Sequence, residues 1–64
     1  MKKEEVELLF KKGDKIVIDM MIDEPSYRGR TGVVEYIDDI GQLHGTWGGL
    51  ALICNYDKFH KVEE

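Results

Sequence analysis

Cysteine, proline and long apolar runs are scarce in this chain. Its 64 residues include one cysteine, Cys54, and one proline, Pro25. A single cysteine cannot form an internal disulfide, and small secreted domains usually depend on several, so we expect a reducing, cytoplasmic setting. No apolar run approaches the roughly 20 residues of a transmembrane helix, and no signal peptide is recognisable, so we expect no membrane association.

Positive charge is also in short supply. The 9 Lys and Arg residues oppose 13 Asp and Glu residues, which leaves a formal net charge of −4. Basic side chains supply most of the affinity for DNA and RNA, so this balance favours a protein or peptide partner over nucleic acid. The composition, 42% apolar and 34% charged, is that of a folded module with a small core.

The clearest pattern lies in the middle of the chain. Residues 31–37 are rich in β-branched and aromatic side chains, which suit a pleated, half-buried surface, and residues 42–47 predict the returning strand. Val33 and Ile37 are both too apolar for a fully exposed face. We therefore expect a bulge near Glu35.

Turn chemistry separates these strands from their neighbours. Asp38 and Asp39 can accept hydrogen bonds from nearby backbone N–H groups, and Gly41 tolerates a positive φ. The pair Gly48-Gly49 predicts a two-residue hairpin that leads into a fourth strand over residues 50–53.

Two further strands flank this region. Residues 13–22 predict the first strand, which begins after a turn at Gly13-Asp14. Ile16, Ile18 and Met20 share the face that we assign to the core, and the apolar run over residues 20–22 predicts a sharp bend or a barrel corner. Residues 23–30 form a loop, because Pro25 cannot donate to a ladder, and residues 59–62 predict a short last strand. The residues that we expect to form the core are Ile16, Ile18, Val34, Leu43, Trp47, Leu50, Leu52 and Phe59.

The N-terminal segment has a different composition. Good helix formers dominate it, and Val6, Leu9 and Phe10 fall on one face, so we expect a helix from about Lys3 to Lys11. So short a helix needs a surface to pack on. We favour a cap over one end of the strand domain, with a partner-binding helix as the alternative.

These elements predict an all-β fold, a small five-stranded SH3-like barrel over residues 13–64 with a helical segment over residues 1–12. A closed or nearly closed barrel removes the exposed edges that five free strands would present. An OB-fold is the alternative, but it usually has a helix between its third and fourth strands, and the sequence predicts none there.

The chain resembles a domain-of-unknown-function family (number 4314) of short SH3-like barrels from bacteria, phages and mobile elements. The resemblance covers residues 12–62, and two pieces of it are shared with KOW modules of ribosome- and polymerase-associated proteins. It rests on Gly13-Asp14-x-Ile16-x-Ile18, Asp23-x-Pro25, Gly29-x-x-Gly32-x-Val34, Asp38-Asp39-x-Gly41-Gln42-Leu43-His44, Trp47, Leu50-Ala51-Leu52-Ile53 and Asp57-x-Phe59.

The resemblance implies a fold and no reaction. The chain departs from the family pattern in its short loop before Gly29 and in the short turn after Trp47. It also departs at Gly45, where the family has a branched apolar residue. We therefore expect the third strand to pack less tightly at that point.

Groups suited to catalysis are few. A nucleophilic site would have to come from Cys54, His44 and His60, and a metal site from Cys54, Asp57 and His60. Cys54 follows an apolar strand, which favours a partly buried small hydrophobe over a nucleophile. The metal set is conceivable at its spacing, but it lacks a second cysteine pair or a His-x-x-x-His pattern. We predict a non-enzymatic module with no catalytic residue, no metal site and no cofactor.

Binding is the function that the residues favour. Tyr27 and Tyr56 fall in loops, and Arg28 and Arg30 beside Tyr27 are the one concentrated positive spot. Together they predict a surface for a protein or an acidic peptide. The alternative is a nucleic-acid or ribonucleoprotein accessory of the KOW type, which is an argument from fold.

Overall fold

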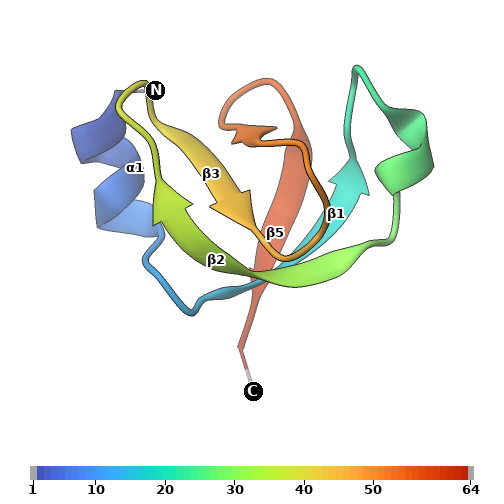
Figure 1. The fold of residues 1–64 in the computed structure, drawn as a ribbon, viewed down its shortest axis with the longest axis horizontal. Helices are drawn as coiled ribbons and strands as arrows, with labels where there is room; N and C mark the ends of the chain where they lie inside the picture. The colour runs from blue at the N-terminus through green and yellow to red at the C-terminus, as the bar shows by residue number, and fades with distance from the viewer. Residues whose placement is uncertain (1, 64) are drawn as a thin grey trace.

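A computed structural model describes residues 2–63 of the chain. Within them the elements are one short helix, one 3₁₀ turn and five strands (Figure 1). Their bounds are α1 Lys3–Leu9, β1 Lys15–Met20, η1 Pro25–Tyr27, β2 Thr31–Ile37, β3 Gln42–Gly45, β4 Leu52–Ile53 and β5 Lys58–Val62. The predicted all-β class with a short N-terminal helix is confirmed.

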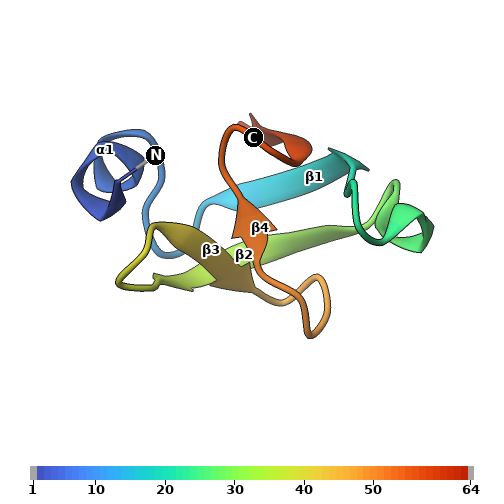
Figure 2. The same ribbon diagram turned by 90° about the horizontal axis from the view of Figure 1, so that it is seen from above.

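The strands form one antiparallel sheet in the order β4-β3-β2-β1-β5. Strand β2 is the longest, and it joins the two halves of the sheet, β1 with β5 and β3 with β4. Its first part, Thr31–Val33, pairs with β1, and its second part, Val34–Ile37, pairs with β3. Figure 2 shows β1 and β5 on one side and β3 with β4 on the other. The sheet is not closed, since β4 and β5 lie at opposite ends of the order.

Two bulges set which side chains point inward. The ladder between β2 and β3 shifts between Val34 and Tyr36, which confirms the predicted bulge at Glu35. A second shift lies between Ile18 and Met20 on β1. Beyond that irregularity it is Met21 that is buried, and the assignment of Met20 to the core is wrong because Met20 is only half-buried.

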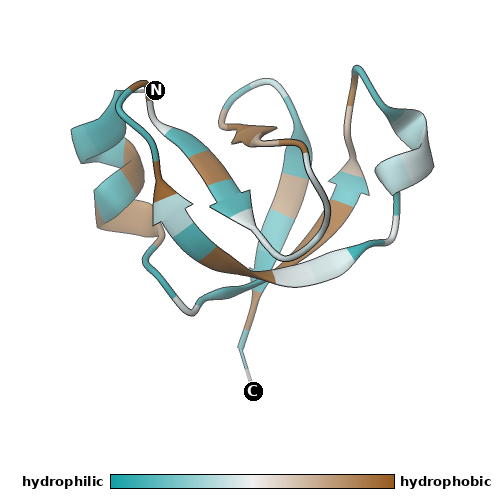
Figure 3. Cartoon of the chain, in the orientation of Figure 1, coloured by the Kyte–Doolittle hydropathy of each residue, from teal (hydrophilic) through white to brown (hydrophobic). Residues whose placement is uncertain are grey.

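The core lies between the two halves of the sheet. Alternating apolar and polar residues are visible along the strands in Figure 3. Of the predicted core, six residues are buried: Ile16, Ile18, Val34, Leu43, Trp47 and Leu52. Phe59 is half-buried against the core. Leu50 is wrong as a core residue, because it lies in a loop and is 44% exposed.

Helix α1 covers one end of the sheet (Figures 1 and 2). Val6 is fully buried, and the Phe10 ring packs against Phe59 with 5.5 Å between ring centroids. The helix ends at Leu9, earlier than predicted, because Phe10 is extended. Leu9 lies outside the buried face, and Leu8 is 86% exposed.

The connection from β3 to β4 spans residues 46–51, so the predicted two-residue hairpin at Gly48-Gly49 is wrong. Trp47 folds back over β3, and its indole N–H donates to the Leu50 carbonyl at 2.8 Å. A Cβ on Gly45 would fall on the Trp47 ring and on the Val33 carbonyl. The expectation of loose packing at Gly45 is therefore also wrong, because the ring takes the space of the missing side chain.

Among the described residues, no helix has the length and apolar character needed to cross a membrane.

Candidate functional site

The first loop is fastened to the end of β1. Gly29 N–H donates to the Ile18 carbonyl at 2.8 Å, and Ile18 N–H donates to the Arg30 carbonyl at 2.9 Å. Between them Pro25 begins η1, where its fixed φ suits a first turn. This loop carries three of the four residues predicted to bind a partner.

Tyr27 and Arg30 lie together against the loop after β3. The Arg30 guanidinium lies 3.9 Å from the centre of the Tyr27 ring, and its Nη1 donates to the Trp47 carbonyl at 3.0 Å. A Cβ on Gly48 would lie 2.6 Å from the Tyr27 hydroxyl, so that ring packs directly on this glycine. The pair fastens two loops to each other, which is a structural task.

The other two predicted residues take no part in these contacts. Arg28 is exposed, and its side chain makes no hydrogen bond or ion pair within residues 2–63. Tyr56 is 43% exposed, and its hydroxyl donates to Asp23 Oδ1 at 2.9 Å. That hydrogen bond to a carboxylate raises the pKa of Tyr56. Within residues 2–63, no hydrogen bond or ring contact joins Tyr56 to Tyr27.

Asp57 holds the start of the first loop, at Ile22, through hydrogen bonds to the backbone. It is buried, its Oδ1 accepts from Ile22 N–H at 3.0 Å, and its Oδ2 accepts from Ile53 N–H at 2.9 Å. Both carboxylate oxygens are thus satisfied by backbone donors. The start of the first loop is held beside β4 by this one side chain.

A cavity of about 200 Å³ opens next to Asp57. Its apolar wall comes from two separate segments of the chain, with Asp23, Gln42 and Asp57 as the polar members. The apolar lining residues are Met21, Leu50, Ala51 and Ile53. We call this feature the Met21–Ile53 groove.

Exposed apolar side chains surround this groove. Leu50 in its wall is 44% exposed, and Tyr56 stands at its edge through the hydrogen bond to Asp23. The Trp47 indole fixes the carbonyl of Leu50, so Leu50 is held in a defined place. Apolar surface kept exposed and in fixed positions around a cavity is typical of a binding site.

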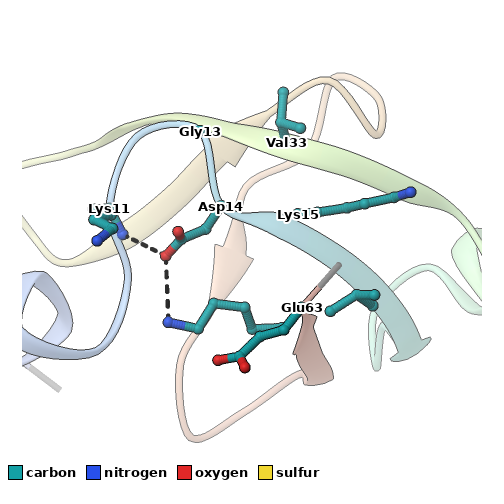
Figure 4. A pocket seen from close by; sticks show the side chains of 8 residues that line it. Lys11, Gly13, Asp14, Lys15, Val33 and Glu63 are labelled. Atoms are coloured by element: carbon teal, nitrogen blue, oxygen red, sulfur yellow. Dashed lines mark hydrogen bonds and ion pairs between the residues drawn. The ribbon is translucent and has the colours of Figure 1, made fainter.

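A larger hollow, about 570 Å³, lies at the far end of β1, and Figure 4 shows its lining. Asp14 points into it and accepts from the Lys11 backbone N–H at 2.9 Å. Asp14 also pairs with Lys61 Nζ at 3.5 Å, and Lys61 donates to the Leu9 carbonyl. Asp14 and Lys61 in this hollow are already paired with one another and with the backbone, so the hollow is a weaker candidate for a binding site than the groove.

The possible catalytic groups do not converge. Cys54 is a free, buried thiol, and burial raises its pKa. His44 pairs with Asp38 at 2.7 Å and stacks on Tyr36, whereas His60 pairs with Asp19. Among residues 2–63, no cluster of three His, Cys, Asp or Glu side chains could hold a metal ion.

Asp38 acts within its turn, as predicted. Its Oδ1 accepts from Ile40 N–H and Gln42 N–H, while His44 meets its Oδ2. Partial burial works to raise the pKa of Asp38, but the hydrogen bonds from His44, Gln42 and Ile40 outweigh it and hold that pKa below its ordinary value. Asp39 pairs with Lys3 on α1.

Sequence reasoning missed most of the groove. Met21 was hidden by the bulge before it, and Ala51 carries no functional signal. The sequence indicated Asp57 as part of the family pattern and of a possible metal site, but not as a cap of backbone N–H groups. Its position four residues after Ile53, in a turn, is the one signal that points to backbone capping.

Comparisons with protein-family models, with curated proteins and with solved structures found no match to this chain.

Proposed function

We propose that this chain is a non-enzymatic protein-binding module that takes a peptide segment into the Met21–Ile53 groove. The observation that carries the proposal is the groove itself, an apolar cavity with exposed, fixed apolar side chains around it. Tyr56, one of the four residues predicted from the sequence, belongs to its edge.

The size of the cavity supports a peptide over a small molecule. Pockets for drug-sized ligands usually measure about 300–1,000 Å³, and this one measures about 200 Å³. It therefore suits a single aliphatic side chain, with the rest of the ligand lying across Leu50 and Tyr56. The side-chain amide of Gln42 lines the cavity and makes no hydrogen bond within residues 2–63, so it is available to a peptide backbone.

The wider architecture fits the same proposal. We infer an SH3-like, barrel-type arrangement, which the strand order and the shared strand β2 support. The lone buried thiol of Cys54 suits a reducing cytoplasm. Arg30 is engaged with Tyr27 and Trp47, which leaves Arg28 as the free cation of the predicted loop surface.

A display selection tests the proposal. A library of random 12-residue peptides is selected on the full chain, and enriched peptides are titrated into ¹⁵N-labelled protein. If peptides bind in the groove, we expect enrichment of peptides with an aliphatic residue, and amide shifts at Met21, Leu50, Ala51 and Ile53. Binding that weakens steeply with salt, or shifts confined to residues 27–30, would contradict it.

A matched pair of leucine variants sharpens this test. Leu50→Ser removes apolar surface at the groove, and Leu8→Ser makes the same change on exposed α1. Loss of one apolar contact of this kind is worth about 1–2 kcal/mol, or roughly 5- to 30-fold in affinity. We expect that loss for Leu50→Ser alone. The reverse pattern would place the interface on the helix.

A further inference from the structure

We propose that the peptide recognised by the Met21–Ile53 groove carries a lysine or arginine next to its aliphatic anchor, and that Asp23 receives this cation. This inference rests on the proposed function and names the chemistry of its partner. It follows from the charge at one side of the groove.

Asp23 is the acidic group that faces this ligand. It lines the cavity, and it is exposed. Its Oδ1 accepts from the Tyr56 hydroxyl at 2.9 Å, which fixes the carboxylate beside the tyrosine ring. Its Oδ2 has no hydrogen-bond or ion-pair partner within residues 2–63, so this oxygen is available to a ligand.

The second acid of the groove is already occupied. Asp57 is buried, and each of its oxygens accepts a backbone N–H. No lysine or arginine of the described chain forms an ion pair with Asp23 or Asp57. The groove therefore presents uncompensated negative charge beside apolar surface, on a protein whose net charge is −4.

An aliphatic side chain with a neighbouring cation is the complement of that surface. The methylenes of lysine or arginine can lie over the Tyr56 ring, while the charged end reaches Asp23 Oδ2. Such a contact is partly exposed, so it sets preference and orientation more than total affinity. An acidic peptide would meet like charge at the same place.

Two single-residue variants with the same net charge test the role of Asp23. Asp23→Asn keeps an oxygen that accepts from Tyr56 but loses the charge. Glu24→Gln removes the same charge one residue away, where the carboxylate accepts from the Ser26 hydroxyl at 2.6 Å and does not line the groove. Long-range electrostatics change equally in both variants, so any difference between them reports local contact.

The probes are capped synthetic peptides that hold one leucine followed, after zero, one or two serines, by lysine, by glutamine or by glutamate. Binding is followed by amide shifts at Met21, Ala51 and Ile53. We expect one lysine spacing to bind about two- to five-fold more tightly than its glutamine counterpart. Asp23→Asn should abolish this preference, Glu24→Gln should preserve it, and added salt should reduce it.

The outcomes separate the two proposals. If leucine peptides with lysine and with glutamine shift the groove amides equally, the proposal of a cation at Asp23 is wrong, whereas the proposal of a peptide site in the groove is kept. Equal loss of preference in Asp23→Asn and Glu24→Gln would also overturn the contact at Asp23. If no leucine peptide shifts the groove amides more than a peptide with serine in place of leucine, both proposals fail.

Discussion

Gly45 offers the sharpest test of the packing in this fold. Its φ is not in the left-handed region, so the backbone there would accept alanine. The obstacle is space, because a Cβ would lie 2.6 Å from Trp47 Cη2 and would meet the Val33 carbonyl even more closely. That carbonyl already accepts from Thr46 N–H at 3.1 Å, so moving it weakens a backbone hydrogen bond.

The cost of Gly45→Ala follows from these contacts. Overpacking usually costs about 1–3 kcal/mol, and the strained hydrogen bond adds about 1 kcal/mol. A domain of this size rarely holds more than about 3–5 kcal/mol in total. With a urea slope near the low end of the usual range, about 1 kcal/mol per M, the midpoint should fall by about 2 M or more, or the protein should be unfolded.

Gly49→Ala is the matched control. No atom lies within 4 Å of a Cβ at Gly49, and its φ is not positive. The same substitution should therefore leave stability unchanged or raise it by up to about 1 kcal/mol through the unfolded state. Urea unfolding followed by Trp47 fluorescence measures both. A Gly45→Ala midpoint equal to that of the natural sequence would refute the close packing of the ring.

Three further predictions concern stability. Trp47→Ala should cost about 2–5 kcal/mol, because it empties the core beside Gly45 and frees the Leu50 carbonyl; an unchanged midpoint by circular dichroism would place the ring at the surface. Asp57→Ala should cost about 2–4 kcal/mol, since two backbone donors lose their acceptor, and Asp57→Asn should cost less; equal costs would contradict the capping role. The folded-state pKa of Asp38 lies below its ordinary value of 3.8. The ionised carboxylate therefore contributes its full stabilisation of the folded state above about pH 3.8, and this stabilisation is lost as the pH falls through the folded-state pKa. Asp38→Asn should flatten the stability profile below about pH 4, and an unaltered profile in acid titrations would contradict this.

The fold was predictable where local pattern and tertiary packing agree. Period-two alternation identified Ile16, Ile18 and Leu43 correctly, because each of them still pairs in register with a neighbouring strand. Even the bulge at Glu35 followed from apolar residues on both faces. Composition alone was enough to separate the helix from the strands.

The errors came from features that local pattern does not encode. Leu50 alternates correctly with Leu52, yet the strand begins only at Leu52 because the Trp47 ring holds a longer loop in place. Met21 is buried because a bulge reverses the alternation. Gly45 was expected to be a weak point because it lacks a side chain. The space is filled by the ring of Trp47, two residues further along the chain, and a strand pattern does not predict that contact.

The groove lay beyond sequence reasoning for a physical reason. Its walls come from segments that meet through the Asp57 carboxylate, and the hydrogen bond to Ile22 N–H spans 35 residues. Apolar residues at such separations give no periodic signal. The sequence indicated Tyr56 as a binding residue but not the cavity that it borders.

The most direct test of the central claim is an NMR measurement of contacts across the complex. A selected peptide, bound to ¹³C-labelled protein, is examined for intermolecular nuclear Overhauser effects from its aliphatic methyl groups. The groove predicts effects to the side chains of Met21, Leu50 and Ile53. Effects to Leu8 and Leu9 on α1, or to Tyr27, with none at the groove, would contradict the account.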